Sequence, residues 1–264
     1  MRRSILGQWL WDNRRGILGW TAAIVLVGSG YAAFWPLIAD PAMQETLNSF
    51  PPEMLEALNY SDIASPLGYL DATVYGLLSA LLLLVYGVSA GARTIAGDEE
   101  AGTLDLVLAH PISRTSLALQ RFAAVAASIV VILAVFWAAM ALVTTITGMD
   151  ELTLGGLTAM HVHVAAFALL FAAVTFAVGA ATGRRGVALG VGAGLSVLAY
   201  AMRGLIPQVE GLDWVADYSA FTWLNGSKPL QNGLDLGHLG IMLGITIVLV
   251  AVGTWAFGRR DVAA

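Results

Sequence analysis

The sequence predicts an all-α membrane protein with six transmembrane helices, and three observations lead to that prediction. Hydrophobic residues make up 58% of the 264 residues, charged residues only 12%, and the mean hydropathy is +0.77. About a quarter of the residues of a soluble domain are charged, so this composition excludes that class. Six uncharged runs approach or exceed the roughly 20 residues that a helix needs to cross a bilayer. The arginines gather at both termini and at alternate connections.

The predicted spans cover residues 16–38, 72–92, 122–147, 164–182, 187–202 and 239–258. These runs are continuously apolar, whereas the strands of a membrane barrel alternate over about ten residues, so helices are expected. The fifth run is the weakest. It reaches full length only if its helix continues past Arg203 toward Pro207, and its outer end is expected to be bent or re-entrant. No soluble domain fits in the connections, so we expect one domain over residues 1–264.

Basic residues indicate the orientation, because short cytoplasmic connections carry an excess of lysine and arginine. All lysines and arginines except Arg203 and Lys228 lie before the first run, after the last, or in or beside the second and fourth connections. Both termini should therefore be cytoplasmic, which requires an even number of spans and agrees with six. Acidic residues gather in the outer connections. The net charge of −5 thus reflects two unlike faces and gives no reason to expect nucleic acid as a partner.

Several kinds of chemistry are disfavoured. The chain has no cysteine, which excludes disulfides and thiolate sites. His161 and His163 are two residues apart and would point to different faces of a helix, so no metal site is predicted. Asp71 and Arg203 lie near the outer ends of their runs, where snorkelling or mutual pairing explains them. No acidic residue lies at a predicted midplane, which disfavours an ion-coupled carrier. No catalytic residue is predicted.

Three shorter segments flank the spans. Residues 4–15 are amphipathic, with Trp9 among apolar residues at helical spacing, and predict a helix in the headgroup layer; a plain extension of the first span is the alternative. In the first outer connection a short helix is expected at residues 53–58. The last outer connection, residues 204–237, is rich in aromatic residues. It is expected either to rest on the headgroups or to form a short re-entrant hairpin.

Residues 95–114 form a polar, turn-rich segment between the second and third runs, here named the coupling segment. Asp98, Glu99 and Glu100 form an acidic cluster on a face that is otherwise basic. Gly102 permits a sharp turn, and Thr103 is a plausible N-cap for a short helix over residues 104–109. The acidic cluster would stabilise the N-terminal end of that helix.

The short helix of the coupling segment is apolar where it should meet water, and such surface usually marks a contact with protein or membrane. Pro111 then ends it, and Ser113 is a suitable N-cap for the helix that becomes the third span. The alternative is an ordinary loop whose charges are merely solvated. The residues alone therefore indicate a docking site without proving one.

The coupling segment resembles the signature of permease subunits of type-2 ABC exporters, A-x-E-x-E-x-G-T-L-x-x-L-L-x-x-P-[ILV]-S-R. The matching residues are Ala96, Asp98, Glu99, Glu100, Gly102, Thr103, Leu104, Val107, Leu108, Pro111, Ser113 and Arg114. Asp98 stands where the family more often has glutamate, and the charge is kept. The six-span layout with both termini inside also resembles that family, as does the N-terminal interfacial helix.

The resemblance implies that this segment holds a coupling helix, which docks into a groove of a separate ABC ATPase. The acidic cluster would face basic residues of that partner, and the stretch from Leu104 to Leu108 would supply the buried contact. Arg114 would be a charge partner or a structural clamp. The chain has no G-x-x-x-x-G-K-[ST] phosphate loop, so it is not expected to be an enzyme and has no cofactor of its own.

The assembly implied by the resemblance has two ATPase subunits, which bind ATP and Mg²⁺, and a second permease, either another copy or a paralogue. It would lie in the plasma membrane of a prokaryote, in contact with lipid. Polar and aromatic residues of the second and fifth spans are candidates for lining a transport path: Tyr75, Ser79, Tyr86, Ser196 and Tyr200. Such a path suits an amphipathic or hydrophobic drug, antibiotic or lipid. The alternative function is an ATP-independent carrier or channel.

Overall fold

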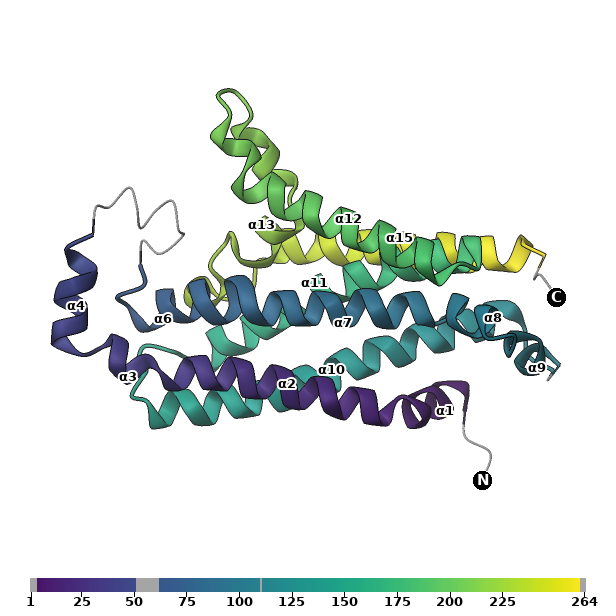
Figure 1. The fold of residues 1–264 in the computed structure, drawn as a ribbon, viewed down its shortest axis with the longest axis horizontal. Coiled ribbons are helices and arrows are strands. Elements are labelled where there is room, and N and C mark those ends of the chain that lie inside the picture. Colours follow the sequence, from purple (N-terminus) through teal and green to yellow (C-terminus); the bar gives the residue numbers. More distant parts are fainter. Residues whose placement is uncertain (1–3, 51–61, 110, 262–264) are drawn as a thin grey trace.

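The computed structural model describes residues 4–50, 62–109 and 111–261, and within them it contains helices and no strand. Six helical segments are long and apolar enough to cross a membrane, and they lie side by side in one elongated bundle (Figure 1). Their bounds are Arg14–Ile38, Pro66–Arg93, Arg114–Ile146, Leu154–Thr182, Arg185–Gln208 and Leu236–Arg259. The prediction of an all-α chain with six spans is confirmed.

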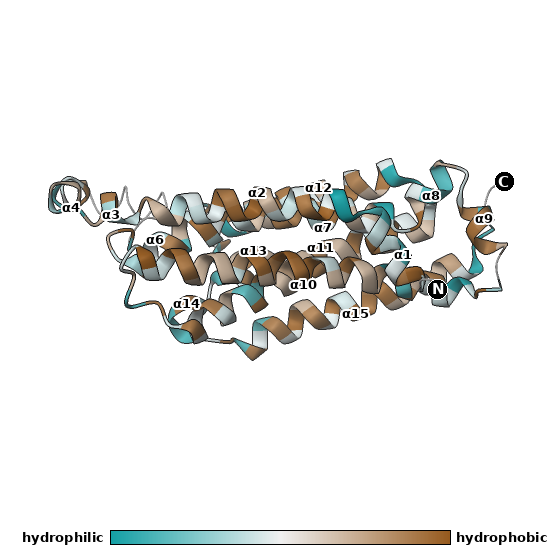
Figure 2. Ribbon diagram, turned by 90° about the horizontal axis from the view of Figure 1, so that it is seen from below, coloured by the Kyte–Doolittle hydropathy of each residue, from teal (hydrophilic) through white to brown (hydrophobic). Residues whose placement is uncertain are grey.

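One end of the bundle gathers the segments that the sequence places on the basic side. Helix α1 (Ile5–Asp12), the coupling segment and the end of α15 (Leu236–Arg259) all lie there (Figure 1). This end holds Arg93, Arg121, Arg185 and Arg260, and it is named the arginine-rich end. Figure 2 shows brown apolar ribbon along the middle of the bundle and teal polar ribbon concentrated toward its ends.

Helix α11 (Leu154–Thr182) is the centre of the bundle, packed against α7, α10, α12 and α15. In its most apolar stretch 72% of the residues are buried, against 17% in the first span and 11% in the fifth. Two glycines of α7 (Ser79–Arg93) allow a close approach to α11, since a Cβ at Gly91 would lie 2.2 Å from the carbonyl oxygen of Ala172. Small residues permit such contacts between membrane helices. The first and fifth spans therefore form the periphery.

The first span begins beyond a short amphipathic helix, as predicted. Ser4 caps α1 by accepting a hydrogen bond from the backbone N–H of Gly7 at 3.1 Å, and Asn13 separates α1 from α2 (Arg14–Ala33). Helix α1 packs against α10 (Arg114–Ile146). The span closes with α3 (Trp35–Ile38), and α4 (Pro41–Asn48) follows. The helix expected at residues 53–58 lies outside the described residues.

The second span contains an irregularity that the sequence pattern does not reveal. It begins with α6 (Pro66–Tyr69), continues as a π-helix η1 (Leu70–Leu78), and then becomes the regular helix α7. The span is longer than the predicted 72–92 because the helix already begins at Pro66, where the Ser65 side chain caps it. A π-helical turn inside an α-helix is rare and often marks a functional position.

The fifth span and the last outer connection form an excursion from the bundle. After α12 (Arg185–Gly204) come two short turns of 3₁₀ helix, η2 (Ile206–Gln208) and η3 (Asp213–Tyr218), which leave the bundle in Figure 1. The chain returns through α13 (Ala220–Asn225) and α14 (Pro229–Asn232). Trp214 is 60% exposed, whereas Phe221 on the returning helix is buried. The connection thus has one exposed part and one packed part.

Asp71 and Arg203 are joined through a third residue rather than directly. The Arg203 guanidinium donates to the Asn225 side-chain oxygen and to the carbonyl of Phe221 at 2.8 Å. The Asn225 amide then donates to the Asp71 carboxylate at 3.3 Å. The two charges therefore do not form the predicted mutual pair; an asparagine on α13 bridges them and holds the excursion against the second span.

Candidate functional site

The coupling segment folds as two short helices between the second and third spans. Helices α8 (Ala96–Glu100) and α9 (Leu104–Leu108) are joined at Gly102, whose φ of +67° is the left-handed conformation that glycine adopts without strain. Ser113 then caps α10, since its Oγ accepts a hydrogen bond from the Ser116 N–H at 3.2 Å. The predicted N-cap at Ser113 is confirmed.

The predicted N-cap at Thr103 is wrong. Its backbone already has helical angles, φ −101° and ψ −10°, and its side chain makes no capping bond to α9. An N-cap side chain needs extended backbone angles to reach over the first turn. The Thr103 hydroxyl instead donates to the carbonyl of Asp98 at 3.2 Å, at the end of the preceding helix. The acidic cluster is itself helical and does not serve as a cap for α9.

The three consecutive carboxylates of α8 reach three different spans. Asp98 forms an ion pair with Arg121 of α10. Glu99 forms an ion pair with Arg260, directly after α15, with 2.6 Å between Glu99 Oε1 and Arg260 Nη1. Consecutive residues of a helix point about 100° apart, so the side chains fan out toward different neighbours. Two of the charges predicted to face a partner are therefore used within the chain.

Glu100 reaches the third of these spans, and it does so through the backbone. Its Oε1 accepts a hydrogen bond of 2.7 Å from the N–H of Arg185, the first residue of α12. This N–H has no acceptor within its own helix, and a carboxylate at a helix N-terminus is favoured by the helix dipole. Glu100 is exposed and the Asp98 side chain is 34% exposed, whereas Glu99 is nearly covered.

The Glu99–Arg260 pair is enclosed by the end of α11. Glu99 is 9% exposed and Arg260 21% exposed. Gly183 ends α11 with a φ of +67°, and a Cβ there would lie 2.5 Å from Arg260 Nη1 and 2.6 Å from Glu99 Oε1. Removing one partner of such a pair leaves an uncompensated charge in a poorly hydrated place. The position therefore requires glycine for its backbone angle and for its lack of a side chain.

Two arginines of α10 complete the fastening. Arg114 donates to the carbonyls of Phe257 at 3.4 Å and of Arg260, and its guanidinium carbon lies 5.7 Å from the centre of the Phe257 ring. The last carbonyls of a helix lack intrahelical donors, so an arginine there stabilises the end of α15. Arg121, which is buried, also donates to the carbonyl of Thr94, just after α7. Of the two roles predicted for Arg114, the structure shows the clamp.

A small hydrophobic cluster lies beneath the coupling segment. Leu104 is 1% exposed and packs with Ile95, Leu117 and Phe257, so it supports the segment from within and its predicted contact with a partner is wrong. Val107 and Leu108 are partly buried against the same cluster. Leu106, which the motif did not single out, is 69% exposed. A five-residue helix has room for one inward and one outward face, and Leu106 is on the outward one.

Several residues of this site were missing from the sequence interpretation. Arg121, Arg185 and Arg260 counted there only as indicators of orientation, and Gly183 had no role. The available signal for these arginines was the cluster of three acidic residues on a basic face, because neighbouring carboxylates repel one another unless cations lie nearby. The sequence could not show which arginines bind the three acids, since these arginines lie on other spans.

The predicted helix-ending residue Pro111 is exposed between α9 and α10.

The five candidates for lining a transport path separate into two sets. Tyr75 and Ser79 are 0% and 1% exposed, and Tyr75 packs on the rings of Phe136 and His161. Tyr86 is also buried and donates to the Ser128 hydroxyl of α10. These three side chains face the core of the bundle, so their predicted place beside an open path is wrong. The three residues follow one another at intervals of four and seven along the span, which places them on one face of the helix, and this face points inward.

The other two candidates border a cavity of about 250 Å³ between the second and fifth spans. Its lining residues are Leu77, Leu81, Leu84, Ser196, Val197, Tyr200 and Phe221. The Ser196 hydroxyl donates to the Gly192 carbonyl at 2.7 Å, so it is not directed at the cavity as a free donor. Tyr200 is 51% exposed and packs edge-on against Phe221. The cavity is therefore apolar and uncharged.

His161 and His163 contact different neighbours, as their spacing predicts. His161 Nδ1 lies 2.8 Å from the Leu157 carbonyl of its own helix, with the ring beside Tyr75. His163 Nδ1 lies 3.2 Å from the Trp223 carbonyl, and its Nε2 accepts from the Asp235 N–H at 3.2 Å. Their contacts tie α11 to its surroundings and do not bring the two rings to a common ligand.

Comparison with protein families gives one match over nearly the whole chain. The family described as "Multidrug efflux system permease Rv1217c, C-terminal domain" matches residues 3–258. That range includes the coupling segment, the first five spans and all of the sixth except its last residue, Arg259. No curated protein matches the chain.

Proposed function

The chain belongs to this multidrug efflux permease family, and on that premise we propose that it is the membrane subunit of an ATP-driven ABC exporter. Separate ATPase subunits would bind ATP with Mg²⁺ and hydrolyse it. The observation that best supports the proposal is the fastening of α8 to the ends of α10, α12 and α15 by three consecutive carboxylates. A loop with no task beyond connecting two spans has no need of such attachments.

The fastening supports a transmission role for the coupling segment. A push on a mobile loop would be absorbed by the loop itself. A push on α8 reaches the third, fifth and sixth spans through Asp98, Glu100 and Glu99, and the cluster around Leu104 transmits compression. Closure of the ATPases can then shift the population between two arrangements of the bundle, because it changes the energy of one relative to the other.

The outward face of α9 is the proposed contact with the ATPase. Leu106 is 69% exposed, its chain neighbour Asp105 is exposed, and Glu100 at the end of α8 is exposed as well. An apolar side chain framed by acidic ones fits a hydrophobic groove with a basic rim. Two permeases and two ATPases would form the complete transporter. The arginine-rich end would then be cytoplasmic, in the plasma membrane of a prokaryote, as the placement of basic residues indicates.

The apolar cavity beside Tyr200 is the proposed place of entry for cargo. It lies against the fifth span, which has the least buried apolar stretch of the six. A second permease, either another copy or a paralogue, could cover this side and enlarge the cavity. An uncharged lining of leucine, valine and aromatic residues suits an amphipathic or hydrophobic compound such as a drug, antibiotic or lipid.

Copurification with candidate ABC ATPases tests the coupling role, and the structure selects the variants. Leu106→Asp should lose the ATPase and ATP-dependent efflux while the permease still purifies as a monodisperse protein. Leu234→Asp is a matched control, because Leu234 is 52% exposed in the outer connection. An intact complex and unchanged efflux in Leu106→Asp would overturn the proposal. Efflux by the permease alone in ATP-free proteoliposomes would establish the alternative, an ATP-independent carrier or channel.

A further inference from the structure

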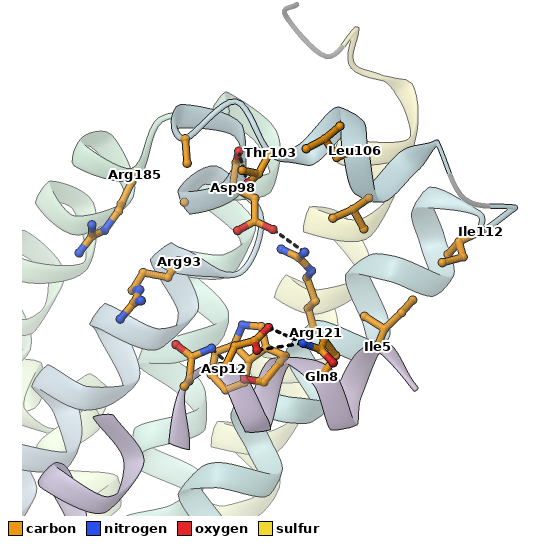
Figure 3. A pocket seen from close by; sticks show the side chains of 15 residues that line it. Ile5, Gln8, Asp12, Arg93, Asp98, Thr103, Leu106, Ile112, Arg121 and Arg185 are labelled. Atoms are coloured by element: carbon orange, nitrogen blue, oxygen red, sulfur yellow. Dashed lines mark hydrogen bonds and ion pairs between the residues drawn. The ribbon is translucent and has the colours of Figure 1, made fainter. Parts of the chain in front are cut away.

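A groove of about 810 Å³ runs along the arginine-rich end between α1, the coupling segment and the starts of α10 and α12 (Figure 3). Its lining is half polar and half apolar in character, with α1 as one wall and α8 and α9 as another. The lining residues are Ile5, Gln8, Trp9, Asp12, Asn13, Arg93, Gly97, Asp98, Ala101, Thr103, Leu106, Val107, Ile112, Arg121 and Arg185. The groove is separate from the apolar cavity between the second and fifth spans.

Some of the charged side chains that line the groove have a partner within the chain, and two arginines form no ion pair among the described residues. Arg121 is paired with Asp98, and Asp12 accepts two hydrogen bonds from Gln8 at 2.9 and 3.1 Å. Arg93 and Arg185 belong to none of the ion pairs among the described residues. Figure 3 shows their guanidinium groups extending to the same side, away from the Asp98–Arg121 pair.

Arg185 is the second of these two arginines. Its Nε is buried and has no hydrogen-bond partner among the described residues. Glu100 binds the backbone N–H of Arg185 and leaves the guanidinium without a carboxylate. The Nε atoms of the ion-paired Arg121 and Arg260 are buried in the same way. What distinguishes Arg185 is a guanidinium that borders the groove without an ion pair among the described residues, so an anion in the groove would stabilise it. Guanidinium groups match the oxygens of a phosphate in geometry and charge.

A small hollow adjoins the groove and favours one source of phosphate. It has a volume of about 60 Å³ and lies between the junction of α1 with α2 and the end of α7. Arg93 and Trp9 border both spaces, while Trp20 and Tyr86 border only the small one. Arg93 thus lies at the boundary between the charged groove and an aromatic recess between the first and second spans. This order of groups matches a phospholipid, whose phosphate precedes apolar chains.

We propose that Arg93 and Arg185 bind the phosphate of an anionic phospholipid, whose glycerol and first methylenes enter the recess beside Trp20. The neighbouring α1 is amphipathic, and Arg14 and Arg15 follow it at the start of α2, which suits the headgroup layer. A free phosphate would use the arginines but not the recess. The bound lipid bridges α7 and α12 beside α8. This inference does not depend on the proposed transport function.

Native mass spectrometry of the full chain in detergent tests the site. Phosphatidylglycerol should bind about tenfold more tightly than phosphatidylcholine, and R93Q/R185Q should lose about that factor, since charge-assisted hydrogen bonds are removed. R15Q/R184Q is the matched control. It removes two exposed arginines from the same end without touching the groove lining. Equal loss in both double variants would overturn the proposal, because it would show only a general attraction to positive charge.

Two further measurements distinguish a lipid phosphate from free phosphate and keep the test valid if the double variant misfolds. Millimolar inorganic phosphate should leave phosphatidylglycerol binding nearly unchanged, and full competition would overturn the lipid assignment. The single variant R93Q changes an exposed side chain, so it replaces R93Q/R185Q if the double variant is not monodisperse, and unchanged affinity in it would also overturn the proposal. If R93Q/R185Q binds the lipid as the control does but loses a copurifying ATPase, the groove is a protein contact instead.

Discussion

Glu99 and Arg260 meet through two hydrogen bonds although 161 residues separate them in the chain. Their contact joins the coupling segment, between the second and third spans, to the end of the sixth. The carboxylate is 9% exposed, so the pair is shielded from water and little weakened by salt. Whatever moves α8 must therefore move the end of α15 with it, or break this pair.

Loss of the Glu99 carboxylate should destabilise the protein. Glu99→Gln leaves the Arg260 guanidinium without its counter-charge, which costs up to about 3–5 kcal/mol for a buried pair. We expect a clearly lower apparent melting temperature by intrinsic fluorescence in detergent. Glu151→Gln, at an exposed position of an outer connection, should change it little. Equal melting temperatures for the two variants would show that the pair contributes nothing to stability.

Two glycines with the same backbone angle should differ in their tolerance of alanine. Gly102 and Gly183 both have a φ of +67°, but a Cβ at Gly102 meets open space and one at Gly183 meets Arg260 and Glu99. Gly102→Ala should cost about 1–2 kcal/mol from the left-handed backbone alone. Gly183→Ala should cost that amount plus displacement of the ion pair, with a larger fall in melting temperature. If the two losses are equal, the close contact at Gly183 is not a constraint.

Leu104 and Leu106 should show opposite effects of truncation. Leu104→Ala empties part of the cluster under the coupling segment and should lower stability by about 2–5 kcal/mol. Leu106→Ala changes an exposed side chain and should shift stability by no more than about 0.5 kcal/mol, while weakening ATPase copurification. Thermal unfolding and pull-down of the same two preparations check both halves. A stable Leu104→Ala that releases the ATPase would reverse the assignment of the two faces.

Filling the apolar cavity should impair efflux without unfolding the protein. Leu81→Trp places an indole ring in the space beside Ser196 and Tyr200. A steric cost of about 1 kcal/mol or more would weaken the binding of cargo in the cavity about fivefold. The measurement is drug accumulation in cells that express the variant at wild-type levels. Leu142→Trp, 62% exposed on α10, is the control away from the cavity. Unchanged efflux in Leu81→Trp would remove the cavity from the transport path.

The class of the protein, its six spans and the location of the coupling segment could all be predicted from the amino-acid sequence. These follow from a one-dimensional constraint, since a helix in lipid needs a continuous apolar run and polar residues collect outside it. Ser113 was also predictable, because a cap bonds to its own helix within three residues. The orientation predicted from the arginines rests on the same local reading of the chain.

Which face of each helix meets which neighbour could not be predicted from the sequence and became known only from the packed bundle. It turned Leu104 inward and Leu106 outward, directed Glu99 to Arg260, and put Tyr75 in the core but Tyr200 beside a cavity. Each of these outcomes depends on contacts between segments far apart in the chain. A membrane helix is apolar on all sides, so its sequence does not distinguish a side that faces lipid from one that faces another helix, and only packing separates the two.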